Sequence, residues 1–290
     1  MSSVNGPRDL SFDHKPVSSL FSREILDPPV GLSMEQIGFF QDNGFLAGIQ
    51  VLDSGQLTKL RGELEVLMEP HQADNPLFYE YHHNESDDPS TTLFHALGAW
   101  RVSEAFHDLL FQRTIVAIAE QLLNGPVRLW HDQIFVKPAR DGAVVAWHQD
   151  YSYWTRTKPM AHLTCWIGLD DSTEENGCVR YIPGSHKWNL LPRYHLSNDM
   201  HAVFEYLTDE QRSAFNPIAA LLKAGEASFH HPLMLHGSYE NTSGSSRRAA
   251  VVNLFRDGVV SDSDEPLLSG VPPVPKGEKV DGRFFPLLSK

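Results

Sequence analysis

The chain has 290 residues, 41% of them hydrophobic, and a formal net charge of −13. This length and composition suit one large globular domain with a sizeable core. The excess of acidic residues argues against a nucleic acid or an anionic membrane as partner, because both favour a basic surface. No stretch reaches about 18 consecutive apolar residues, so the sequence predicts no transmembrane helix.

The first 30 residues show no clear periodicity, and we interpret them as an arm that packs on the body. Ser33, with Gln36 three positions later, matches a capping box and predicts the start of a helix. Gly44 is a plausible stop for that helix.

A second helix is predicted from about Ser54 to Met68. Residues 70–92 are polar and predict a loop, and helical signals return at 103–123. The second helix has one apolar face, formed by leucines at three- and four-residue steps: Leu57, Leu60, Leu64 and Leu67.

After Gly125-Pro126 the sequence becomes rich in β-branched and aromatic residues, in short runs separated by turn signals. Many short strands of this kind indicate an all-β sandwich or barrel, and a jelly roll is one such form. The predicted strands are 127–136, 143–149, 161–169, 178–182, 226–231 and 248–255.

We therefore expect a single domain over residues 1–290 that is mainly β with flanking helices. Residues 1–126 would form the arm and the helices, and residues 127–260 would form the β core. A polar, partly helical insert is expected near 195–222, and a coil tail over 261–290.

His148 and Asp150 are separated by one residue in a strand-like run. Side chains alternate along a strand, so both are expected on one face. His236, on a later strand-like run that ends in Gly, would supply a third ligand. Two histidines and one carboxylate suit iron(II) and leave coordination positions open. Those positions could take a 2-oxo acid through two atoms and then O₂.

The pair His148 and Asp150 is a weak signal alone, because a chain with 15 histidines gives roughly one such match by chance. His148 could also be an ordinary hydrogen-bonded histidine. His83 and Glu85 share a similar spacing, but they lie in a polar loop with no strand to aim them, so we interpret them as a decoy.

His230 and His231 compete with His236 for the third position, and one of them could face the site. His236 is preferred because the basic pair Arg247-Arg248 follows it. A guanidinium can hold both oxygens of the distal carboxylate of a 2-oxo acid. Neighbours in a strand face opposite ways, so only one arginine can serve, and either could be solvated instead.

The ordered motifs resemble the phytanoyl-CoA dioxygenase family of iron(II)- and 2-oxoglutarate-dependent oxygenases. The segment from Gln36 to Phe45 also resembles the opening helix of that family. The other matching motifs, in chain order, are His131-Asp132-Gln133, Lys137-Pro138, Trp147-His148-Gln149-Asp150, Cys165 to Asp171, Glu175 to Cys178, Ile182 to Lys187, Leu235-His236-Gly237-Ser238 and Arg247-Arg248.

The resemblance implies a double-stranded β-helix, which is a cupin-like jelly roll. It implies that Fe(II) is bound by His148, Asp150 and His236, and that Arg247 binds the distal carboxylate of 2-oxoglutarate. Asp150 disfavours halogenation, because related halogenases replace this carboxylate with a small residue.

The resemblance also places Trp166 beside the co-substrate, with Lys137 and Gln133 lining the same pocket. It implies an oxidoreductase that uses Fe(II), 2-oxoglutarate and O₂ to hydroxylate an unactivated C–H bond of a small organic molecule. Succinate and CO₂ would be released. His186 matches a structural turn rather than a ligand.

Two other classes stay open: a cupin-like metalloenzyme with a different reaction, and a non-catalytic metal-binding protein. Cupins typically place two histidines as H-x-H, and this chain has no H-x-H. The substrate also stays open. The residues that could either line its pocket or serve in the core or at the surface are Tyr151, Tyr153, Trp154, Arg156 and Lys158.

The two cysteines, Cys165 and Cys178, do not form a C-x-x-C pair, so we expect reduced and mostly buried thiols. Residues 1–13 lack the apolar segment of a signal peptide. We therefore expect a cytoplasmic monomer or homodimer whose partner is a small-molecule substrate.

Overall fold

A computed structural model describes residues 8–21, 31–193 and 199–289, so the predicted N-terminal arm lies partly outside the described residues. The α-helices are α1 Met34–Asn43, α2 Ser54–Leu67, α3 Glu104–Leu109, α4 Arg113–Leu123 and α5 Asp209–Ser213. The 3-10 helices are η1 Leu10–Phe12, η2 Pro70–Asp74, η3 Ala99–Arg101, η4 Asp150–Tyr153, η5 Ser185–Lys187 and η6 Ala202–Tyr206.

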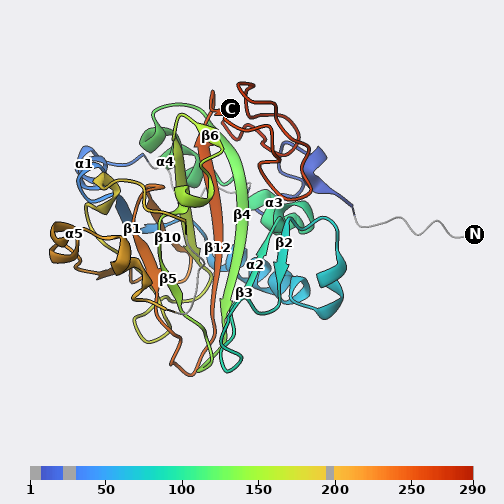
Figure 1. Cartoon of the computed structure of the whole chain (residues 1–290). Helices are drawn as coiled ribbons and strands as arrows, with labels where there is room; N and C mark the ends of the chain where they lie inside the picture. Colours follow the sequence, from blue (N-terminus) through green and yellow to red (C-terminus); the bar gives the residue numbers. More distant parts are fainter. Residues whose placement is uncertain (1–7, 22–30, 194–198, 290) are drawn as a thin grey trace, which may run out of the picture.

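Two antiparallel sheets and one small β-ribbon form the core. The large sheet has the order β1-β10-β7-β12-β4-β3-β2, and the small sheet has the order β5-β11-β8-β9. Figure 1 shows the long strands β4 and β12 side by side in the middle of the molecule. The strands are β1 Phe45–Gln50, β2 Glu80–His82, β3 Phe94–Leu97, β4 Val127–Lys137, β5 Val145–His148, β6 Thr157–Lys158, β7 His162–Gly168, β8 Val179–Tyr181, β9 Ile218–Ala219, β10 Glu226–His230, β11 His236–Ser238, β12 Arg247–Arg256 and β13 Val260–Ser261.

The inner faces of the two sheets pack on each other. Trp166 and Val251 of the large sheet share one buried cluster with Val179 and Tyr181 of the small sheet. This is the interior of a two-sheet sandwich. The predicted fold class, mainly β with flanking helices around a jelly-roll core, is confirmed.

The helices cover the other face of the large sheet. The leucine face of α2 and the apolar residues Ile115 and Ile118 of α4 join a large cluster with Ile134 and Leu254 of the sheet. The predicted capping box at Ser33 and Gln36 is formed. The stop at Gly44 is also confirmed, because this residue has φ 82° and no room for a side chain: an added Cβ would lie 2.3 Å from Nδ1 of His186.

The sequence predicted that the β core begins near residue 127, and this is wrong. Strands β1, β2 and β3 of the N-terminal part belong to the large sheet, and β2 lies inside the predicted loop at 70–92. These three strands are short and lie between helical segments of the chain, so the neighbouring helix signals dominated the prediction there. The helical segment 103–123 is also divided, into α3 and α4.

The described part of the insert, residues 199–222, packs on the small sheet, where Val203 and Leu207 join Trp147 and Leu235 in one cluster. Among the described residues of the tail after Ser261, no helix or strand occurs.

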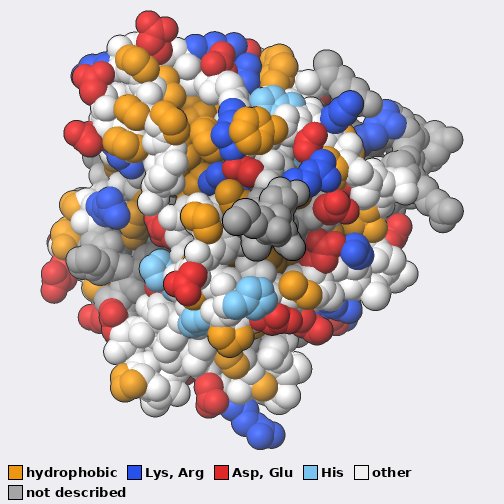
Figure 2. Space-filling model, turned by 90° about the vertical axis from the view of Figure 1, so that its right-hand side faces the viewer, with side chains coloured by type: hydrophobic (Ala, Val, Ile, Leu, Met, Phe, Trp, Pro, Cys, Tyr) orange, Lys and Arg blue, Asp and Glu red, His pale blue; other side chains and the backbone are white. Residues whose placement is uncertain are grey.

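Cys165 and Cys178 are free and buried, as predicted. None of the described helices has the length and hydrophobicity needed to cross a bilayer. Acidic and basic side chains are interspersed over the face shown in Figure 2.

Candidate metal centre and co-substrate cavity

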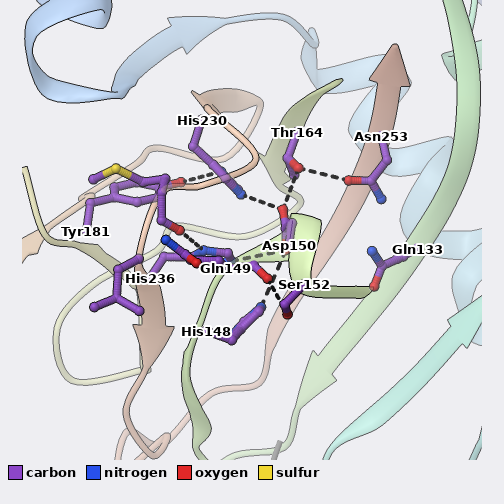
Figure 3. Close-up of polar contacts among 12 residues, drawn as sticks. Gln133, His148, Gln149, Asp150, Ser152, Thr164, Tyr181, His230, His236 and Asn253 are labelled. Carbon is purple, nitrogen blue, oxygen red and sulfur yellow. Dashed lines mark hydrogen bonds and ion pairs between the residues drawn. The ribbon is translucent and has the colours of Figure 1, made fainter. Parts of the chain in front are cut away.

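Three side chains meet between the two sheets, and they are the three predicted ligands. His148 ends β5 and His236 begins β11, and these strands pair so that the two histidines are direct partners. One ligand atom from each of His148, Asp150 and His236 lies within 4.8 Å of the other two. Figure 3 shows both imidazoles turned toward the carboxylate of Asp150.

Asp150 reaches this position by a route that differs from the predicted one. It does not continue the strand but is the first residue of η4. The side chain of Gln149 holds the turn, because its amide donates to the Leu233 carbonyl at 2.9 Å and accepts from the Leu191 N–H at 2.8 Å. The turn brings Asp150 Oδ1 to 3.5 Å from His148 Nε2 and 3.6 Å from His236 Nε2.

The backbone sets the tautomers of the two histidines. Nδ1 of His148 lies 2.8 Å from the Ala146 carbonyl, and Nδ1 of His236 lies 2.9 Å from the Met234 carbonyl. A carbonyl only accepts hydrogen bonds, so each Nδ1 carries the hydrogen and each Nε2 keeps its lone pair. This is the form in which imidazole binds a metal ion.

The second carboxylate oxygen of Asp150 is already used. Oδ2 accepts hydrogen bonds from Thr164 Oγ1 at 2.6 Å and from His230 Nε2 at 3.0 Å. Burial opposes ionisation of Asp150, but His236, His148 and His230 outweigh it and hold the pKa of this carboxyl well below its usual value. Asp150 is therefore a carboxylate with Oδ1 directed toward the two ligand histidines.

The competition between His230, His231 and His236 is resolved by their partners. Nε2 of His230 donates to Asp150 and its Nδ1 faces the Tyr181 hydroxyl at 3.0 Å, so both ring nitrogens are occupied. Nδ1 of His231 accepts from the Leu233 N–H. His236 is the one that joins the ligand group.

A cavity of about 330 Å³ adjoins the three ligands, and Arg247 lines it together with Trp166. Arg247 is only 2% exposed, and its Cζ lies 5.2 Å from the centre of the Trp166 ring. Its guanidinium has no hydrogen bond or ion pair with any described residue, and its buried Nε is left unpaired. Burial lowers the pKa of Arg247 to about 10, so the group stays charged near pH 7. An unpaired buried cation suits an anionic ligand.

Arg248 faces away from the cavity, as expected for neighbours in a strand. Its Nε donates to Asp170 Oδ2 at 2.8 Å and its Nη2 donates to Asp170 Oδ1 at 2.9 Å. Arg248 therefore has a counter-ion and Arg247 has none among the described residues.

Gln133 lines the cavity, and its side-chain oxygen lies 2.9 Å from Nε2 of His95. Lys137 does not line it, which corrects the expectation from the resemblance. The Lys137 ammonium is fully buried and donates to the hydroxyl of Ser238 and to the carbonyl of Tyr239. These two acceptors hold the ammonium away from the cavity surface.

The remaining candidates divide clearly. Oε2 of Glu85 lies 2.5 Å from Nδ1 of His95. Among the described residues, Glu85 and His83 do not belong to a group that could hold a metal ion. Tyr153 and Trp154 line the cavity, whereas Tyr151 does not. Arg156 lines the cavity, and its guanidinium donates to the carbonyls of Pro266 and Leu267. Lys158 lies elsewhere and forms an ion pair with Asp262 at 2.7 Å.

The sequence indicated His230 only as a rival ligand, and it did not indicate the other residues that support Asp150. Thr164 and His230 contact Asp150 from other strands, and Tyr181 and Ser228 extend the network behind His230. Only the pairing of strands brings these residues together, so no local spacing could have indicated them.

The profile of one protein family, described as phytanoyl-CoA dioxygenase (PhyH), matches residues 40–249. The chain belongs to the phytanoyl-CoA dioxygenase family. It is therefore an iron- and 2-oxoglutarate-dependent dioxygenase, as the resemblance implied.

Three known proteins are similar to this chain over most of their own length. L-proline trans-4-hydroxylase of Streptomyces griseoviridis is 29% identical over 196 residues, which are 58% of this chain and 72% of the relative. Phytanoyl-CoA dioxygenase of Arabidopsis thaliana is 28% identical over 251 residues, which are 75% and 87%. The crystal structure of the non-haem alpha-ketoglutarate-dependent carbocyclase SnoK from nogalamycin biosynthesis matches with a TM-score of 0.71 and 25% identity, over 89% of this chain and 96% of that chain.

Proposed function

We propose that this protein hydroxylates an unactivated C–H bond of a small organic molecule, with Fe(II), 2-oxoglutarate and O₂, and releases succinate and CO₂. One observation carries the proposal: a three-residue metal group and an unpaired buried arginine face the same cavity. The whole chain would act as one catalytic domain.

In this proposal the ligand atoms are Nε2 of His148, Oδ1 of Asp150 and Nε2 of His236. The geometry fits, because both imidazoles have free Nε2 lone pairs and Asp150 is ionised. When bound, iron and 2-oxoglutarate supply the oxidative decarboxylation and the oxidising power for the C–H bond. The protein holds them in place and excludes water from the site.

Arg247 would bind the distal carboxylate of 2-oxoglutarate, with Trp166 against the same group. The distance of 5.2 Å between the Arg247 Cζ and the indole centre supports this pairing, because the ring keeps the guanidinium in one position. Gln133 would offer its amide to the co-substrate from the cavity wall. Lys137 would act only indirectly, through Ser238.

A small polar or amphipathic substrate is supported by the cavity, which combines aromatic side chains with Gln133, Glu85 and His95. The relative from Streptomyces griseoviridis is named L-proline trans-4-hydroxylase, which supports a small molecule as the substrate of this chain. We keep a cytoplasmic monomer or homodimer as the working form of the protein.

The proposal is tested by anaerobic titration with Fe(II) and 2-oxoglutarate, followed by the visible metal-to-ligand charge-transfer band. Arg247→Gln should weaken 2-oxoglutarate binding by about tenfold to a hundredfold, because a charge-assisted pair is lost. Arg248→Gln is the matched control: it removes the neighbouring arginine, which faces Asp170 instead of the cavity, and should leave this binding unchanged.

Asp150→Ala should abolish the band and iron-dependent succinate formation. Full succinate formation by Asp150→Ala would contradict the ligand assignment. Equal effects of Arg247→Gln and Arg248→Gln would contradict the role given to Arg247.

A further inference from the structure

Strand β4 contains a β-bulge beside the metal group. In its pairing with β12, Asn253 is opposite His131 but Leu254 is opposite Leu129, so Trp130 is an extra residue. A bulge re-aims side chains, and here both Trp130 and His131 line the cavity. In a regular strand one of two neighbours would point away.

The imidazole of His131 is fixed from its Nδ1 side. Nδ1 lies 3.2 Å from Nδ2 of the Asn253 side chain, as the amide is placed in the structure, and 3.4 Å from the Asp132 carbonyl oxygen. The ring also packs edge-to-face on Trp154, with centres 5.7 Å apart. His131 is 3% exposed, and burial lowers its pKa to about 4, so the ring is neutral near pH 7.

The hydrogen bonds around Asn253 decide which nitrogen of His131 carries the hydrogen. Thr164 has one hydroxyl hydrogen, and the carboxylate of Asp150 takes it at 2.6 Å. Thr164 therefore cannot also donate to Asn253 at 3.0 Å. The amide of Asn253 must instead donate its N–H to Thr164 and offer its oxygen to His131, since the two ends of an asparagine amide are alike in shape.

This orientation gives one consistent direction: His131 donates to Asn253, Asn253 to Thr164, and Thr164 to Asp150. Figure 3 shows the last three of these residues in line. Nδ1 of His131 then carries the hydrogen, which agrees with the Asp132 carbonyl nearby. Nε2 keeps its lone pair. No described residue forms a hydrogen bond with Nε2.

We propose that His131 is a substrate-binding residue whose Nε2 accepts a hydrogen bond from an O–H or N–H group of the substrate. Nε2 has no donor among the described residues and is not one of the fully buried unpaired atoms, so a ligand in the cavity that His131 lines can reach it. His131 and Asp150 line the same cavity, so the donor group and the oxidised carbon of the substrate would lie in one pocket. The proposal deepens the proposed function and rests on it: the substrate is a hydroxy, amine or amide compound, not a bare hydrocarbon.

The tautomer can be measured without substrate or activity. Nitrogen-15 NMR of the metal-free protein with labelled histidines should show His131 protonated at Nδ1 and bare at Nε2, with its signals assigned by their loss in His131→Phe. A hydrogen on Nε2 would overturn the proposal, because the ring would then present a donor to the cavity.

The recognition is tested with matched compounds that differ only in the donor. The probes are L-proline against tetrahydrofuran-2-carboxylate, and 3-hydroxybutyrate against 3-methoxybutyrate, scored by succinate release and product. For any pair that is turned over, we expect the donor compound to be preferred about tenfold or more. His131→Phe should remove this preference, and His131→Gln, whose side-chain oxygen can accept, should restore part of it.

His162→Phe is the matched control. His162 packs on Trp130 and Trp154, with ring centres 5.5 Å and 5.4 Å away, but it does not line the cavity. This variant should keep the wild-type preference. Equal use of both members of a pair by the wild type, or an unchanged preference in His131→Phe, would overturn the role of His131. Loss of the charge-transfer band in the wild type would instead count against the proposed function.

Discussion

Hydrogen bonds divide the three histidines around Asp150 into two that keep Nε2 free for a metal ion and one that supports the carboxylate. His148 and His236 give their Nδ1 hydrogens to backbone carbonyls, which leaves Nε2 free. His230 gives its Nε2 hydrogen to Asp150 Oδ2, and the Tyr181 hydroxyl faces its Nδ1. Asp150 therefore presents a single oxygen to the metal group, and a carboxylate that binds through one oxygen leaves more of the coordination sphere for co-substrate.

Loss of the His230 hydrogen bond should weaken iron binding. His230→Leu leaves Asp150 Oδ2 with Thr164 as its remaining side-chain donor, so the carboxylate is freer to rotate. We expect about tenfold to a hundredfold weaker Fe(II) binding, the usual effect of losing an outer partner of a ligand. Anaerobic Fe(II) titration measures it.

His230→Gln provides the rescue, because the glutamine amide can place an N–H near the position of the histidine Nε2. It should regain most of the iron affinity, whereas a purely structural role would leave both variants equally impaired. Iron affinity of wild-type strength in His230→Leu would show that Thr164 alone suffices to hold Asp150.

The sequence indicated the chemistry of the site better than its geometry. His148, Asp150, His236 and Arg247 were predicted, and the structure brings all four around one cavity. The role of His131 could not be predicted, because it depends on a one-residue bulge in a pairing that no local pattern reveals. The resemblance placed Lys137 in the cavity wall, but its ammonium donates to Ser238 and Tyr239 instead, a long-range contact that the sequence does not show.

At the scale of elements, predictions succeeded where turn signals separate runs of β-branched and aromatic residues. The six predicted runs correspond to β4, β5, β7, β8, β10 and β12. The prediction for Asp150 reached the right position by the wrong route, because the strand ends at His148 and a 3-10 turn follows. That turn depends on the long-range contacts of Gln149, which the sequence alone does not show.

Arg156 connects the turn after η4 to the C-terminal coil. Its guanidinium donates to the carbonyls of Pro266 and Leu267, and Leu267 and Leu268 are buried in the cavity wall. Arg156→Ala should loosen this wall, because two carbonyls lose their donor. We expect faster amide hydrogen exchange in residues 262–269, measured by mass spectrometry.

Lys158→Ala is the control for this prediction, because Lys158 is half-exposed and forms only a surface ion pair with Asp262. A surface pair contributes about 0–1 kcal/mol, so exchange in the same segment should change little. If Arg156→Ala left exchange in residues 262–269 unchanged, the coil would be held by its apolar contacts rather than by Arg156.

At the scale of the whole molecule, the β sandwich encloses several histidines that the fold keeps neutral. Burial lowers the pKa of His131 to about 4 and that of His162 to about 3, and that of His231 to about 4. In the unfolded chain a histidine has its ordinary pKa near 6.5. At a pH below about 6.5, these histidines therefore bind protons more readily in the unfolded chain than in the folded one.

The free energy of unfolding should consequently fall as the pH drops from 7 to 5. Each buried neutral histidine contributes about 2 kcal/mol to this loss, since the unfolded histidine takes up a proton there and the folded one does not. In His162→Phe one such contribution is absent, so its stability should fall by about 2 kcal/mol less over the same interval. Urea unfolding at both pH values measures the difference. A wild-type slope in His162→Phe would mean that the fold accepts a proton on His162 despite its burial.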